Sequence, residues 1–208
     1  MNILKISLMT FMLCFSATGF SKDGIVGSGA LFYFTEGTEV PSSTTGVESI
    51  KYTTEYTYLD LGFCYNMGVI CLGAKYLDAK VKNDIKYVLT NGISTTGTFG
   101  SETAFGGVAL KAGFSGQALI AHASYFINPT LTDTTLSGFA SNTLTYNVTA
   151  ATAVDIGYGF KLKGMRIGPM ISAISFDVSG YTQEDGVEVD QKLTYNYTAP
   201  YFAIWIDF

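Results

Sequence analysis

His122 is the single histidine of the chain, so any catalysis by an imidazole must use this residue. Ser124 follows two positions later, and in a β-strand this spacing places both side chains on one face. A histidine can activate a serine hydroxyl when an acidic residue orients the imidazole, and Asp133 is the nearest acid downstream. His122 and Ser124 are therefore weak catalytic candidates. The alternative, which we favour, is a structural histidine inside a β-protein.

Cys64 and Cys71 flank a segment whose centre, Met67-Gly68, is typical of a hairpin turn. Glycine adopts the positive φ that such a turn often needs, at no steric cost. With Met67-Gly68 as the loop, Cys64 stands opposite Cys71 and Asp60 stands opposite Lys75. An oxidising compartment would allow a disulfide between the two cysteines, and two free thiols are the alternative.

Other charged residues share the face on which Asp60 and Lys75 lie. Buried charges require partners, so we expect a salt-bridge network inside the protein, with a polar permeation path as the alternative. The residues of this predicted network are Asp60, Lys75, Lys111, Asp155, Lys161, Arg166 and Asp207.

Two further turns, Ser115-Gly116 and Lys163-Gly164, have the same form as the first. Each turn fixes which residues face each other, because a register shift by one residue exchanges the two faces. The expected pairs are Ala112 with Leu119 and Phe160 with Ile167. Pro169 cannot donate to a ladder, so a bulge or local break is predicted there.

The three hairpins sort the residues in the same way: one face is apolar, and the other combines charges with glycines. Since both faces look enclosed, the pattern favours a barrel with a filled interior and lipid outside, over a soluble sandwich. Longer connections alternate with the short turns, which gives eight strands. These connections are expected near 36–48, 82–100, 128–141 and 180–191. Strands longer than a membrane requires, such as the one through 51–56, could extend as sheet above it.

Composition agrees with this architecture. The 208 residues include 14 Tyr, 15 Phe and 23 Gly, only 14% are charged, and the mean hydropathy is +0.27. The net charge of −5 argues against nucleic acid as a partner. No motif for a metal or a cofactor is present, and we predict neither.

The start of the chain is typical of an export signal. Lys5 precedes the apolar stretch 6–15, and 17–19 provides a small-x-small cleavage site. The stretch is shorter than the roughly 20 residues of a spanning helix. We therefore predict a signal peptide over 1–21, cleaved near 19–21, and a mature domain over 22–208.

At the C-terminus, apolar residues alternate with others up to the last position: Phe202, Ile204, Ile206 and Phe208. This strand resembles the terminal assembly signal of bacterial outer-membrane barrels, and the mature chain resembles the OmpA/OmpX/OmpW-type small-barrel superfamily. The resemblance implies an all-β fold, an eight-stranded antiparallel up-and-down transmembrane β-barrel. It also implies a bacterial outer-membrane location, with lipids, lipopolysaccharide and the barrel-assembly machinery as partners.

The tripeptide His122-Ala123-Ser124 is similar to the His-x-Ser element of outer-membrane lipid A deacylases. That family has asparagine after the serine and a glutamate in the triad, whereas Tyr125 follows the serine here.

Three functions follow. We favour a non-enzymatic structural or surface-interaction role through external loops that bind a surface ligand. The second is a narrow channel or conduit for small or apolar solutes, as in OmpW-like relatives, and the third is the deacylase.

Overall fold

The computed structural model describes residues 23–90, 99–116, 118–137 and 140–207. The predicted signal peptide and Phe208 lie outside this part of the chain. Every regular element in the described residues is a β-strand, and none of these residues forms a helix long and apolar enough to cross a membrane. The strands are β1 (Gly24–Pro41), β2 (Val47–Met67), β3 (Ile70–Leu89), β4 (Phe99–Ser115), β5 (Leu119–Phe126), β6 (Thr130–Ser137), β7 (Ala140–Tyr158), β8 (Phe160–Leu162), β9 (Met165–Thr182) and β10 (Glu188–Asp207).

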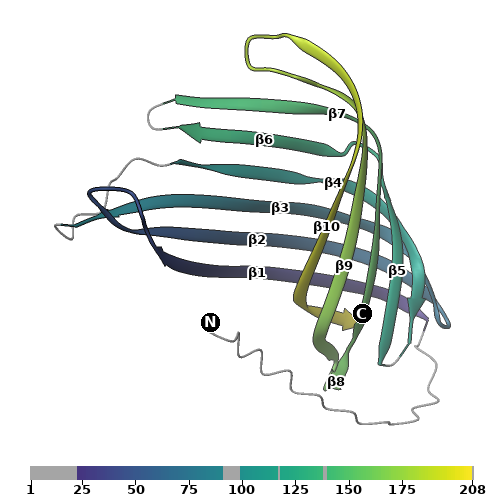
Figure 1. Ribbon diagram of the computed structural model, residues 1–208. Coiled ribbons are helices and arrows are strands. Elements are labelled where there is room, and N and C mark those ends of the chain that lie inside the picture. Colours follow the sequence, from purple (N-terminus) through teal and green to yellow (C-terminus); the bar gives the residue numbers. More distant parts are fainter. Residues whose placement is uncertain (1–22, 91–98, 117, 138–139, 208) are drawn as a thin grey trace.

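The ten strands form one antiparallel sheet that closes on itself, because β10 returns to pair with β1 (Figure 1). β5 and β6 both pair with β4 and β7, and β7 and β8 both pair with β9. β5 and β6 therefore share one strand position of the ring, and β7 and β8 share another. The ten strands thus occupy eight positions. This confirms the predicted all-β fold with eight antiparallel strand positions.

The registers of the three hairpins were predicted with different success. The third is confirmed, since Phe160 pairs with Ile167. In the first, Tyr65 pairs with Leu72, so the loop is Gly68-Val69 and the predicted Met67-Gly68 loop is wrong. Gly68, with φ of +65°, takes the first loop position and not the second. The hairpin glycine can occupy either position, and the sequence does not distinguish them.

The second register is also wrong, because Ala112 pairs with Ala123 and not with Leu119. The ladder ends at Ser115 opposite Ile120, which makes the connection longer than two residues. Both errors are shifts by an even number of residues. They therefore leave every side chain on its predicted face.

The break expected at Pro169 is confirmed, since β7 ends at Tyr158 and β8 begins at Phe160 across from it. The connection predicted over 128–141 is wrong, because β6 occupies most of it. Here Gly107, with φ of +141°, allows a bulge: a β-carbon on it would lie 2.6 Å from the carbonyl oxygen of Asn128. The bulge exchanges the inward and outward positions after Phe126. A strict period of two carried on from β5 therefore does not predict β6.

The other three predicted long connections are partly strand as well, so the strands are longer than expected. β1 runs on to Pro41, β3 to Leu89 and β9 to Thr182, and the segment 51–56 lies within β2. We call the end of the ring with the glycine turns the turn end and the opposite end the loop end.

The outward surface changes character between these two ends. Exposed apolar side chains cover the turn-end half, among them Leu61, Phe63, Leu72, Leu110, Ile156, Ile171, Phe202 and Ile204. Exposed polar and charged side chains take their place in the loop-end half, among them Glu39, Lys51, Asp78, Lys80, Lys86, Asn147 and Asp177.

The ring is joined over only a short length at β1 and β10. Their ladder has four pairs, from Val26 with Asp207 to Gly29 with Ile204. From Ala30 towards the loop end, β1 pairs with β2 alone. From Ala203 towards the loop end, β10 pairs with β9 alone. Figure 1 shows the two strands diverging towards the loop end.

Candidate functional site inside the ring

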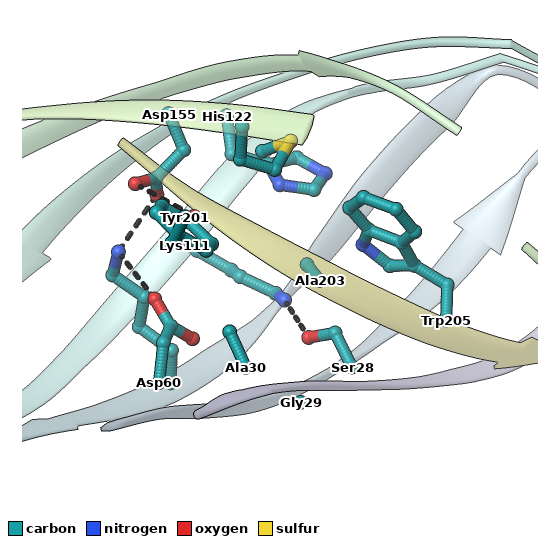
Figure 2. A pocket seen from close by; sticks show the side chains of 12 residues that line it. Ser28, Gly29, Ala30, Asp60, Lys111, His122, Asp155, Tyr201, Ala203 and Trp205 are labelled. Carbon is teal, nitrogen blue, oxygen red and sulfur yellow. Dashed lines mark hydrogen bonds and ion pairs between the residues drawn. The ribbon is translucent and has the colours of Figure 1, made fainter. Parts of the chain in front are cut away.

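A buried ion cluster lies inside the turn-end half of the ring. The Lys75 ammonium nitrogen is 3.1 Å from a carboxylate oxygen of Asp60 and 2.7 Å from one of Asp155 (Figure 2). β3 supplies the lysine, and β2 and β7 supply the acids. All three residues are buried, so each charge depends on the others for compensation.

Two tyrosines cover this cluster on the side of the loop end. The hydroxyl of Tyr58 donates to Asp60 at 3.4 Å, and the hydroxyl of Tyr201 donates to Asp155 at 3.4 Å. Their rings stack with centroids 4.7 Å apart. Because both rings are buried, they separate the ion cluster from the space beyond.

Lys111 reaches the same region from β4, and its ammonium group donates to the hydroxyl of Ser28 at 3.2 Å. Gly62 provides the room for it, since a β-carbon there would lie only 2.7 Å from the lysine nitrogen.

Arg166 forms a separate contact set nearer the turn end. Its guanidinium is 2.9 Å from a carboxylate oxygen of Asp207 and donates to the carbonyl oxygen of Gly116 at 2.7 Å. Lys161 stands opposite Arg166 in the ladder, as predicted, but its side chain is exposed. Including Lys161 in the network was wrong, because its side chain is exposed even though Arg166, opposite it in the ladder, is buried.

His122 lies inside the ring, directly opposite Asp155 on the neighbouring strand. In the described part of the chain neither His122 Nε2 nor the hydroxyl oxygen of Ser124 has a hydrogen-bond partner. Asp133, the acid considered for a triad, instead accepts hydrogen bonds from Thr103 and Tyr146. Burial, followed by hydrogen bonds to Tyr195 and Asp133, raises the pKa of Tyr146 well above its ordinary value.

Cys64 and Cys71 form a disulfide with 5.6 Å between their α-carbons. The ladder pairs Cys64 with Gly73 and Cys71 with Asn66, so the bond runs diagonally across the hairpin. A β-carbon at Gly73 would lie 2.8 Å from that of Cys64, and the glycine therefore leaves space for the bond.

Little space is left around the ion cluster. The cavity there has a volume of about 20 Å³, and Lys75, Lys111, His122, Met170 and Trp205 are among the residues that line it. A void of this size has room for about one water molecule. The described residues thus fill the inside of the turn-end half.

A much larger cavity, of about 590 Å³, lies on the loop-end side of Tyr58. We call it the aromatic chamber. Six rings line it: Phe32, Phe34, Tyr56, Tyr58, Phe105 and Tyr197. The chamber lies where β1 and β10 part, since β1 supplies Phe32 and Phe34 while β10 supplies 197–200. The chamber was not predicted from the sequence, although its rings alternate along β1 and β2.

The remaining predicted residues are placed as follows. Phe202 and Ile204 point outwards from β10 and are exposed, as is Ile206. No group of three or more potential metal ligands occurs among the described residues.

The chain matches no family model, and no curated protein matches it. The function must therefore be inferred from the ring and the two regions inside it, the ion cluster and the aromatic chamber.

Proposed function

We propose that the chain is a transmembrane β-barrel of the OmpA/OmpX/OmpW type in a bacterial outer membrane. The support is the apolar outward surface of the turn-end half. Along β2 it runs from Leu59 to Met67, and along β9 from Met165 to Ala173. A tilted membrane strand needs about 9–11 residues, which these segments supply. The polar loop-end half would then project from the bilayer as sheet.

The same proposal accounts for both ends of the chain. The segment 1–21 would direct export, and the C-terminal alternation through Ile204 and Ile206 would be recognised by the barrel-assembly machinery. The apolar half would contact lipid, and the charged outward side chains just above it, such as Lys80, would lie at the level of lipopolysaccharide head groups.

Within this barrel, we propose that the aromatic chamber captures small apolar molecules. The single observation that carries this function is a chamber of about 590 Å³, lined by six aromatic rings, at the place where β1 and β10 part. Ligand pockets typically have volumes of about 300–1,000 Å³ and mainly apolar walls. Entry would be sideways, between the unpaired parts of β1 and β10.

The ion cluster closes the chamber on the side of the turn end. It fills the barrel on the turn-end side of Tyr58 with paired charges, so a molecule in the chamber would meet a closed floor. We therefore propose a capture site with a lateral entrance, and not a continuous pore.

Binding of the neutral fluorophore N-phenyl-1-naphthylamine to protein refolded in lipid nanodiscs would test this function. Ala199 lines the chamber, and Ala199→Phe should occupy part of it and weaken binding about tenfold or more. Ala173→Phe is the matched control, because Ala173 is exposed on the outward face of β9.

Saturable binding that only Ala199→Phe weakens would support the chamber. Binding no stronger than that of protein-free nanodiscs would contradict it. The predicted role of external loops in binding a surface ligand would then be the better proposal.

A further inference from the structure

The rings of the aromatic chamber are arranged as a wall and not as isolated side chains. Phe105 and Tyr197 stack with centroids 4.3 Å apart. On the other side Phe34 lies between Phe32 and Tyr56, at 6.2 Å and 6.1 Å. The faces of aromatic rings carry partial negative charge and attract cations.

One carboxylate belongs to the same wall. Glu36 follows Phe32 and Phe34 on the inward face of β1 and lines the chamber with them. Tyr56 donates to its carboxylate over a long distance of 3.5 Å. No lysine or arginine in the described ranges forms an ion pair with Glu36.

Lys80, the other charged residue that lines the chamber, lies on the outward face of β3 and does not balance Glu36. Its ammonium nitrogen is 2.8 Å from a carboxylate oxygen of Glu102, so its charge is already compensated. The chamber therefore differs from the ion cluster below it, where Lys75 lies between two acids. Within the described residues, the chamber carries an uncompensated negative charge beside six rings.

We propose that the chamber selects organic cations, in particular aromatic or alkyl ammonium ions with an apolar body. This inference depends on the proposed capture function and narrows its ligand class. The rings would hold the apolar body and the face of the cation, and Glu36 would neutralise its charge. An anion of the same shape would be repelled by both.

The test compares benzyltrimethylammonium with neopentylbenzene, which has the same shape without the charge. Each is used to displace N-phenyl-1-naphthylamine from refolded protein in lipid nanodiscs, with protein-free nanodiscs as the blank. We expect the cation to bind roughly tenfold more tightly than the neutral compound, and Glu36→Gln to reduce this ratio to about twofold. Glu55→Gln is the matched control, because Glu55 neighbours Tyr56 but points to the outer face of β2.

The outcomes separate the two proposals. Equal affinity of the wild type for the two compounds, or a cation preference that stays near tenfold in Glu36→Gln, would overturn the cation selectivity and leave the capture function standing. If the fluorophore itself does not bind above the blank, the capture function fails, and the selectivity fails with it.

Discussion

Lys75 and Asp155 meet across the inside of the ring, with 2.7 Å between ammonium and carboxylate, although 80 residues separate them in the sequence. Their strands, β3 and β7, are not neighbours, because β4 and β5 lie between them in the sheet. The contact therefore connects two strands across the inside of the ring that share no ladder hydrogen bonds. Asp60 completes the cluster from β2, so one buried lysine compensates two acids.

The first prediction concerns this lysine. Lys75→Met should lower the free energy of unfolding by about 3–5 kcal/mol, because it leaves two buried carboxylates without a counter-charge. Lys80→Met, on the same strand, removes a half-exposed ion pair with Glu102 and should cost only about 0–1 kcal/mol.

Denaturant unfolding of the refolded protein, followed by the fluorescence of Trp205, measures both variants. Trp205 is buried in the ring and is the chain's one tryptophan. Equal losses for the two lysines would show that the cluster does not hold the walls together.

Much of the fold could be predicted because β-structure has a period of two. The turn glycines and the alternation gave the strand positions and the face of each side chain. These were enough to place Asp60 and Lys75 on one face of one hairpin, where the structure has them 3.1 Å apart. A register error of two residues did not matter here, since long side chains reach diagonal neighbours.

The rest of the site depends on the closure and curvature of the whole ring. The alternation along β7 predicts that Asp155 points inwards. Its contact with Lys75, however, depends on the registers of all the strand pairs together. The short β1–β10 ladder likewise cannot be predicted from parity, and the aromatic chamber lies where these two strands part. Lys161 shows another limit, since it shares the predicted inward face with Arg166 opposite it, and yet only Arg166 is buried.

The second prediction concerns Gly62. Gly62→Ala should displace the ammonium group of Lys111, because the new β-carbon would lie 2.7 Å from its nitrogen and 2.8 Å from the Ser28 hydroxyl. Overpacking of this kind costs about 1–3 kcal/mol. Gly37→Ala is the control: its nearest contact would be 3.7 Å, an ordinary van der Waals distance.

A double-mutant cycle identifies the cause of this loss. In a Lys111→Ala background, Gly62→Ala should cost clearly less than in the wild type, measured by the same unfolding curves. An unchanged cost would mean that the clash is with the Ser28 hydroxyl or with the carbonyl oxygen of Ala74 on β3, and not with the lysine.

The third prediction concerns the disulfide. Alkylation of unreduced, unfolded mature protein should label neither Cys64 nor Cys71, and prior reduction should expose both to the reagent. Replacing both with serine should lower stability by about 2 kcal/mol, since the bond closes a short loop. Labelling of both thiols without reduction, detected by mass spectrometry, would contradict the bond.

The last prediction concerns conduction. In a planar bilayer the wild-type protein should be silent, because the ion cluster and its two tyrosines fill the inside of the ring and leave a cavity of only about 20 Å³. Asp60→Ala/Lys75→Ala/Asp155→Ala removes the cluster without leaving a charge unpaired among these three residues, and it should produce reproducible openings. Lys80→Ala/Glu102→Ala removes an ion pair outside the cluster and should stay silent. Strand-rich circular dichroism must show that each variant is folded. Wild-type openings of the same conductance as the triple variant would mean that the cluster does not close the barrel, and a polar permeation path through it would replace the closed floor.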